Sequence, residues 1–187
     1  VDYFHTGGPT SGETISLDRV VNDGDWPGSR TQLVDSTNLG KYRFEVRNKR
    51  STDLMYSRGF ASIYGEWETT AEPKTVHRTF HESLRFPWPR EAVVVTLSKR
   101  QPDNRFAPLW TTDIDPGSRF VVAVPIKQHA RRVWPVFING PAATKVDLLV
   151  IGEGYTAREM PKFHGDVKRL LPALFEQEPF KSRRADF

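Results

Sequence analysis

The 187-residue sequence contains no cysteine and only two methionines. The absence of cysteine excludes disulfide-linked scaffolds, thiolate zinc sites, iron–sulfur clusters and thiol catalysis. No apolar run approaches the ~18 residues of a membrane-spanning helix, and no secretory signal is present. The first residue is Val1 rather than an initiator methionine. We therefore expect the chain to be a processed form or an excised piece of a globular protein.

The sequence also lacks a strong charge of one sign. It has 27 Lys and Arg residues against 23 Asp and Glu residues, which gives a net charge of +4. The densest basic stretches, residues 129–132 and 181–184, are short and isolated, whereas nucleic-acid binding usually needs a basic stripe. Hydrophobic residues make up 37% of the chain. The composition predicts a buried core and predicts neither a nucleic-acid partner nor a membrane span.

Most of the chain has a hydrophobic period of two residues. In residues 41–47, apolar Tyr42, Phe44 and Val46 alternate with charged side chains, which is typical of a strand with one buried face. Residues 92–97 are apolar on both faces, which favours a central strand. Comparable patterns predict further strands at residues 15–21, 60–64, 76–86, 106–111, 119–126 and 133–138. With turn-forming residues between them, these strands predict an antiparallel β-sandwich or jelly-roll-like domain over residues 1–140.

The pattern changes after the small-residue connector Asn139–Thr144. Residues 145–151 are almost all apolar and predict a strand covered on both faces. Thr156 and Glu159 have the spacing of a capping box, and apolar residues then recur at helical spacing. We expect Pro161 and Pro172 to kink or split this helix. Residues 145–187 are therefore predicted to be the incomplete beginning of an α/β domain.

The histidines are candidate metal ligands. His81-Glu82 starts a zinc-peptidase motif, but Arg85 occupies the position of the second histidine ligand and cannot bind a cation. His77 and His81 would lie about 13 Å apart along one face of a strand, too far to share a metal. The remaining histidines, His5, His129 and His164, are isolated in the sequence and receive no function. We therefore assign no catalytic and no metal-binding residue.

Three other patterns have two interpretations each. Asn22–Asp25 and Asp113–Asp115 are rich in oxygen ligands that calcium would accept, but Asp and Gly serve turns equally well. Gly152-x-Gly154 ahead of a helix could cradle a phosphate, although a tight turn explains both glycines more simply. The three tryptophans in or next to β segments could stack on sugar rings or fill a core; they are Trp67, Trp88 and Trp110.

The segment that begins at residue 145 carries a family resemblance. A strand runs into Gly152-x-Gly-Tyr-Thr, followed by Lys162-Phe-x-x-Asp-Val and by Phe175-x-x-Glu-Pro-Phe. These features resemble the start of the catalytic domain of the IgA peptidases, metallopeptidase family sixty-four. Residues 1–7 and 15–20 are similar to the amino-terminal β domain that precedes this catalytic domain.

The resemblance implies a bacterial protein that is secreted, periplasmic or at the cell surface, and a zinc endopeptidase built on a His-Glu-x-x-His helix. That motif does not occur in the sequence, so no family residue is transferred, and the implied zinc belongs to a catalytic domain beyond these residues. The expected function is a non-catalytic accessory domain that packs against or positions the catalytic domain and its protein substrate. Self-association through residues 145–187 is a further expected contact, because an exposed strand edge invites pairing.

Two alternatives remain open from the sequence. One is a free-standing carbohydrate- or protein-binding β-sandwich module, in which case the resemblance is incidental. The other is an enzyme that uses Asp and His side chains grouped only by the fold.

Overall fold

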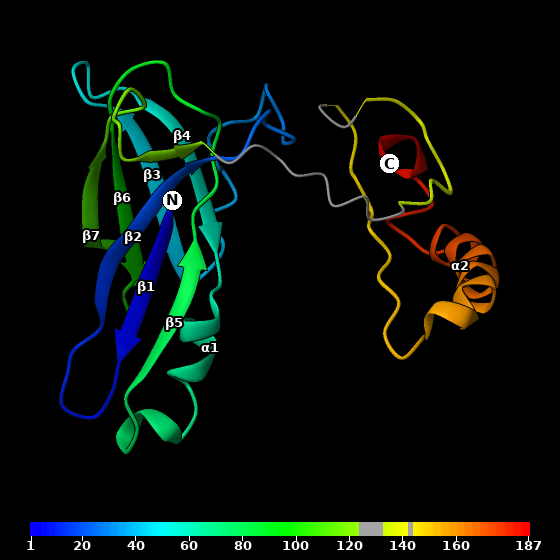
Figure 1. Ribbon diagram of the computed structural model, residues 1–187, viewed down its shortest axis with the longest axis horizontal. Helices are drawn as coiled ribbons and strands as arrows, with labels where there is room; N and C mark the ends of the chain where they lie inside the picture. The colour runs from blue at the N-terminus through cyan, green and yellow to red at the C-terminus, as the bar shows by residue number, and fades with distance from the viewer. Residues whose placement is uncertain (124–132, 142–143) are drawn as a thin grey trace. The chain divides into compact units, whose positions relative to one another are not determined.

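The computed structural model describes residues 1–123, 133–141 and 144–187 (Figure 1). The chain forms two compact units. The β unit comprises Val1–Trp26 and Thr31–Lys127, and the C-terminal unit comprises Pro27–Arg30 and Gln128–Phe187. That residues 1–140 and residues 145–187 fold as separate domains stays a prediction. Among the described residues, no helix has both the length and the apolar character needed to cross a bilayer.

The β unit contains two four-stranded sheets (Figure 1). The first sheet has the order β5-β1-β2-β8, in which β2 and β8 are parallel and the other pairs antiparallel. Its strands are β5 (Arg78–Ser83), β1 (Asp2–Gly7), β2 (Thr14–Asn22) and β8 (Val121–Ala123). The second sheet is antiparallel throughout and has the order β4-β3-β6-β7. Its strands are β4 (Leu54–Phe60), β3 (Tyr42–Asn48), β6 (Val93–Arg100) and β7 (Phe106–Ile114).

One hydrophobic core unites side chains of both sheets. In β3 the burial alternates, so that Tyr42, Phe44 and Val46 are buried and the residues between them are half-buried. Strand β6 lies between β3 and β7, as its apolar character predicts, and Val93 is fully buried. From the first sheet and its flanks, Tyr3 and Leu84 complete the same cluster. The predicted fold class, a mostly β protein with a sandwich, is confirmed.

One local prediction in the β unit is corrected, and two strands were not predicted. Residues 60–64 are not a strand, because β4 ends at Phe60 and α1 (Ile63–Trp67) follows. The side chain of Ser62 caps α1 by accepting a hydrogen bond from the Gly65 backbone N–H at 3.0 Å, and such a cap favours a helix over continued extension. A short η1 (Glu72–Lys74) precedes β5. Strands β1 and β4 were not predicted from the period of two.

The two predicted strands that follow β7 have different outcomes. The predicted strand at residues 119–126 is represented by β8, and its residues 124–126 lie outside the described residues. No strand occurs at residues 133–138, so that prediction is wrong. Val133 and Ile138 are each 76% exposed, and a strand needs a hydrogen-bonded partner that this segment does not have among the described residues.

The C-terminal unit is built around α2 (Met160–Leu174), preceded by η3 (Ala157–Glu159) and followed by η4 (Arg184–Asp186). The predicted capping box is present: the Thr156 backbone N–H donates to Glu159 Oε2 at 3.0 Å. Pro161 does not split the helix, because it occupies the first turn, where a backbone N–H has no helical acceptor. Pro172 lies inside the last turns of α2.

The predicted strand at residues 145–151 has no partner strand in the part of the chain that the structure describes. The Val146 backbone N–H instead donates to the Asp186 carbonyl at 2.7 Å, and no ladder follows. Apolar side chains along the segment are exposed; Leu149 is 72% and Ile151 79% accessible. The sequence pattern of a covered strand is therefore present without the sheet that would cover it.

Candidate functional site

The β unit encloses a charged network centred on His5. Alternation along β1 directs Tyr3 and His5 inward, and His5 is fully buried. His5 Nε2 lies 2.7 Å from Glu13 Oε1, and His5 Nδ1 lies 3.0 Å from Glu82 Oε2. Because both partners are carboxylates, which only accept hydrogen bonds when ionised, both ring nitrogens donate and the imidazole is cationic. The ring also stacks on Tyr64 at 3.7 Å between centroids.

The network continues to the second sheet. Tyr42, on β3, donates from its hydroxyl to Glu13 Oε1 at 2.7 Å. Lys99, on β6, donates to Glu13 and, at 2.7 Å, to Glu68 Oε2 just after α1. Lys41 Nζ lies 2.6 Å from Glu68 Oε1. Hydrogen bonds therefore connect β1 of one sheet to β3 and β6 of the other.

The electrostatics of the network follow from burial and pairing. Burial alone would lower the pKa of His5, but the hydrogen bonds with Glu13 and Glu82 outweigh it and raise that pKa. Burial alone would raise the pKa of Glu13, but hydrogen bonds from His5, Lys99 and Tyr42 lower it to about 2. Burial together with the Glu13 carboxylate raises the pKa of Tyr42. The carboxylates are therefore ionised and the tyrosine is neutral at ordinary pH.

Every carboxylate oxygen in the network accepts at least one hydrogen bond or ion pair. On Glu82, Oε1 accepts from the Tyr64 backbone N–H at 3.1 Å and Oε2 accepts from the Tyr3 hydroxyl at 2.9 Å. Three carboxylates face three cations: Glu13, Glu68 and Glu82 against His5, Lys41 and Lys99. The charges are balanced, and none of these carboxylate oxygens is left without a partner. The chemistry of the network suits linking the two sheets rather than catalysis.

The structure places His81-Glu82 on a strand, as the period of two predicts. His81 is exposed, whereas the carboxylate of Glu82 is turned inward to Tyr3 and His5. Successive residues of a strand point to opposite faces, so this pair cannot bind one metal. His77 lies just before β5, where its ring contacts the hydroxyls of Thr10 and Ser11, each at 3.2 Å.

The acidic turns have partners that explain them. Asp23 accepts from Arg85 at 2.8 Å, and Asp113 accepts from Lys49 at 2.7 Å. Asp115 accepts from the Gly117 backbone N–H at 2.9 Å, which is the usual arrangement of an Asx turn. These contacts favour the turn interpretation over calcium binding.

Backbone conformation and close packing explain the two glycines before α2, Gly152 and Gly154. Gly154 has a φ of +79°, a conformation that favours glycine. A Cβ atom on Gly152 would lie 3.0 Å from the Phe163 ring. Both observations fit the tight-turn interpretation.

The tryptophans in or next to the sheets form no exposed sugar platform. Trp67 belongs to the buried core, and its indole N–H donates to Glu72 Oε2 at 2.8 Å. Trp110 packs against the same core and stacks on Tyr3 at 6.1 Å between ring centroids. Trp88 is half-buried. Core packing is therefore their main role.

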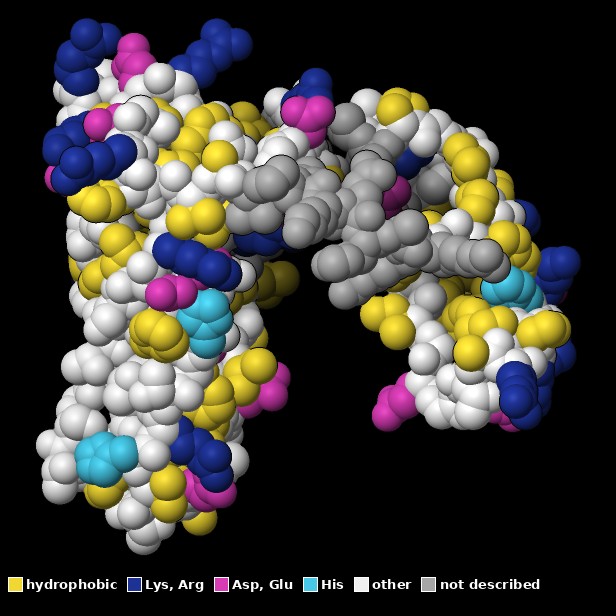
Figure 2. Space-filling view, viewed as in Figure 1, with side chains coloured by type: hydrophobic (Ala, Val, Ile, Leu, Met, Phe, Trp, Pro, Cys, Tyr) yellow, Lys and Arg dark blue, Asp and Glu magenta, His cyan; other side chains and the backbone are white. Residues whose placement is uncertain are grey.

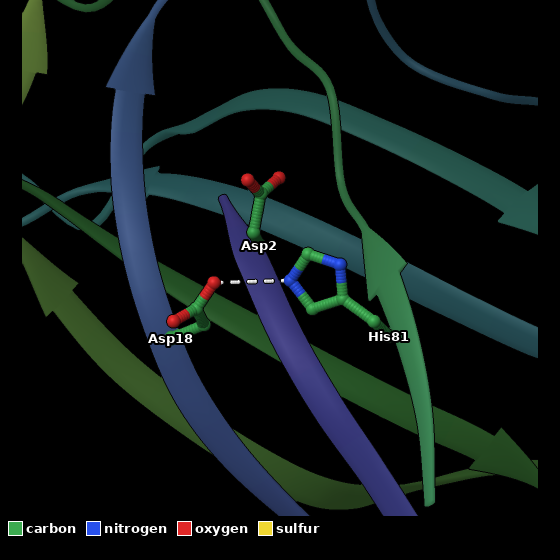
Figure 3. A group of neighbouring side chains, drawn as sticks. All are labelled: Asp2, Asp18 and His81. Carbon is green, nitrogen blue, oxygen red and sulfur yellow. Dashed lines mark hydrogen bonds and ion pairs between the residues drawn. The ribbon is translucent and has the colours of Figure 1, made fainter.

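A second cluster lies on the outer face of the first sheet (Figure 3). Asp2, Asp18 and His81 come from β1, β2 and β5, and one potential ligand atom from each lies within 4.8 Å of the others. His81 Nε2 is 3.0 Å from Asp18 Oδ2. Sequence reasoning missed this cluster, because 63 residues separate Asp18 from His81.

Sequence reasoning also missed the His5 network. The only signal was that His5 falls in phase with Tyr3 and Gly7 on the inward face of one short strand.

Comparison with known proteins gives two consecutive matches. Residues 1–111 match the family model described as Peptidase M64 N-terminus, and residues 135–187 match the one described as IgA Peptidase M64. No curated protein sequence matches the chain. The first match alone covers more than half of the 187 residues and agrees with the resemblance at residues 1–7 and 15–20. The second agrees with the resemblance carried by the segment that begins at residue 145. The chain therefore belongs to the M64 family of IgA peptidases.

Proposed function

We propose that the β unit is a non-catalytic accessory domain of a secreted zinc metallopeptidase, and that the C-terminal unit is the beginning of its catalytic domain. In this proposal the β unit packs against the catalytic domain or positions a protein substrate near it. The order of the two family matches supports the arrangement, because the amino-terminal family model precedes the peptidase model along the chain.

The observation that carries the proposal is the unpaired apolar segment at residues 145–151. Its side chains have the pattern of a strand covered on both faces, yet Leu149 and Ile151 are exposed. Burying one such side chain is worth about 1.5–3 kcal/mol. Hydrophobic side chains also gather on the face of the C-terminal unit seen in Figure 2. We infer that further strands of a peptidase domain pair with this segment and cover it.

The saturated His5 network supports the accessory role of the β unit. A catalytic carboxylate or histidine needs access to substrate, whereas His5 is fully buried and its two ring nitrogens are both bonded to carboxylates. Trp67 is buried and Trp110 packs partly buried against the same core, which disfavours the alternative of a carbohydrate-binding module that stacks sugars on these rings.

The proposal is tested by extending the chain along its gene. We expect the reading frame beyond Phe187 to encode a His-Glu-x-x-His motif. The extended protein should cleave immunoglobulin A and lose this activity on treatment with a zinc chelator. Residues 1–187 alone should cleave nothing. A stop codon directly after Phe187, or chelator-sensitive cleavage by residues 1–187 alone, would contradict the proposal.

A further inference from the structure

We propose that Asp2, Asp18 and His81 form a surface site for a divalent transition-metal cation, with Zn²⁺ as its reference ligand. The site does not depend on the function proposed above. It lies in the β unit, on the outer face of the sheet that contains β5, β1 and β2 (Figure 3).

The sheet register brings the three side chains together. Phe4 of β1 pairs with His81 of β5 on one side and with Ser16 of β2 on the other. Asp2 and Asp18 each lie two residues further along their strands, so they share the face of Phe4 and Ser16. Figure 3 shows His81 and Asp18 pointing toward each other across β1, with Asp2 on the strand between them.

A β-bulge aims the Asp18 carboxylate. Tyr3 pairs with Leu17 and Asp2 pairs with Arg19, so Asp18 is the extra residue without a partner in the ladder. Bulges redirect side chains and are over-represented next to functional sites. Here the bulge places Asp18 Oδ2 at 3.0 Å from His81 Nε2, although the two residues are on strands that are not neighbours.

The donor set and its spacing suit a zinc-like cation. Zn²⁺ binds imidazole nitrogen and carboxylate oxygen at about 2.0–2.2 Å, which places the ligands of a tetrahedral site about 3.3 Å from one another. The His81–Asp18 pair is already close to this spacing, and the ligand atom of Asp2 lies within 4.8 Å of both. Rotation of one short side chain closes the remaining distance. Three protein ligands leave the fourth position to water.

The surrounding charge is also suitable. Two carboxylates and one cationic side chain, Arg19, give a net charge of −1 when His81 is neutral. Arg19 Nε lies 2.8 Å from Asp2 Oδ2, so it orients that carboxylate while the other oxygen remains available. It also competes with a metal for Asp2. The side chain of His81 is 47% exposed, which gives a cation direct access from solvent.

The proposal is tested by titrating the 187-residue chain with ZnCl₂ in a calorimeter. We expect one zinc ion per chain, and we expect Mg²⁺ not to displace it, because imidazole favours Zn²⁺ over Mg²⁺. His81→Ala and Asp18→Asn should each weaken binding about tenfold or more. His77→Ala is the matched control and should leave the affinity unchanged, since His77 is not part of the cluster and its ring nitrogens bond the hydroxyls of Thr10 and Ser11.

Arg19→Gln separates this site from adventitious binding, because removing the competing cation should tighten zinc binding at Asp2. Circular dichroism of each variant checks that the fold is intact. The proposal is overturned if wild type binds no zinc, if His81→Ala binds it as tightly as wild type, or if His77→Ala removes the binding.

Discussion

His5 Nδ1 lies 3.0 Å from Glu82 Oε2, across neighbouring strands β1 and β5. The contact is buried at the centre of the β unit, where His5 has no solvent access. The second nitrogen of the same ring contacts Glu13. One cationic ring thus binds two carboxylates in the interior, and the stability of the β unit depends on keeping all three charged.

Removal of one partner should be strongly destabilising. His5→Ala leaves Glu13 and Glu82 without their shared cation, and such a loss in a buried ion pair costs about 3–5 kcal/mol. His77→Ala removes an exposed histidine whose ring nitrogens bond neutral hydroxyls, and should change the stability by about 0.5 kcal/mol or less. Urea denaturation of both variants measures the difference. Equal stability losses in the two variants would show that the network contributes little.

The same network predicts a pH range of greatest stability. The pKa of His5 is raised from 6.5, so its contribution is complete below pH 6.5 and is lost as the pH rises through the folded-state value. The pKa of Glu13 is lowered from 4.5 to about 2, so its contribution is complete above pH 4.5 and is lost as the pH falls toward 2. Stability should therefore be greatest between about pH 4.5 and 6.5.

Denaturation of wild type and His5→Gln across this range tests the assignment. The variant should lack the decline above pH 6.5 but keep the decline at acid pH, where the carboxylates of Glu13 and Glu82 become protonated. If the decline above pH 6.5 persists in His5→Gln, another group causes it.

The two faces of β3 should respond differently to truncation. Phe44 is 3% exposed in the core, and Phe44→Ala should cost about 3–5 kcal/mol. Arg43 is on the opposite face of β3, where its guanidinium lies 4.6 Å from the Phe106 ring centroid and 3.1 Å from Glu45. Arg43→Ala should therefore cost about 0.5–1 kcal/mol. Unfolding midpoints that fall equally in both variants would contradict the burial pattern.

Limited proteolysis distinguishes two positions for the boundary between the β unit and the C-terminal unit. The sequence places the weakest point at the connector Asn139–Thr144, of which residues 142–143 lie outside the described residues. The Asn139 side chain donates to the Ala185 carbonyl at 2.8 Å, which ties the connector into the C-terminal unit. The β unit, as a compact unit of the fold, ends at Lys127, and the C-terminal unit resumes at Gln128. Brief trypsin digestion should therefore first release a fragment that ends near Lys127. A first fragment that ends at Lys145, the first trypsin site after the connector, would instead support the boundary at residue 140.

The sequence predicted β3 from its complete alternation and the central β6 from its continuous apolar run. It missed β1, because a buried histidine and an exposed Phe4 obscure the alternation there. It assigned a strand to residues 60–64, where the side-chain cap at Ser62 starts a helix instead. The apolar pattern of residues 145–151 indicates burial, but a pattern alone does not supply a partner strand.

Neither cluster could be found from sequence spacing. The pairing of β1 with β5 joins His5 to Glu82 across 77 positions. The pairing of β1 with both β5 and β2 brings His81 close to Asp2 and Asp18. Sheet register determines these contacts, and register depends on the whole fold. The family resemblance, in contrast, rests on local motifs, and both family matches confirm it.

The central claim is that the β unit assists a peptidase of which this chain holds only the beginning. The most direct measurement is kcat/KM for immunoglobulin A, using the extended gene product with and without residues 1–123. If the β unit positions the catalytic domain or its substrate, removing these residues should lower kcat/KM while the peptidase domain retains its zinc. An unchanged kcat/KM without the β unit would contradict this claim.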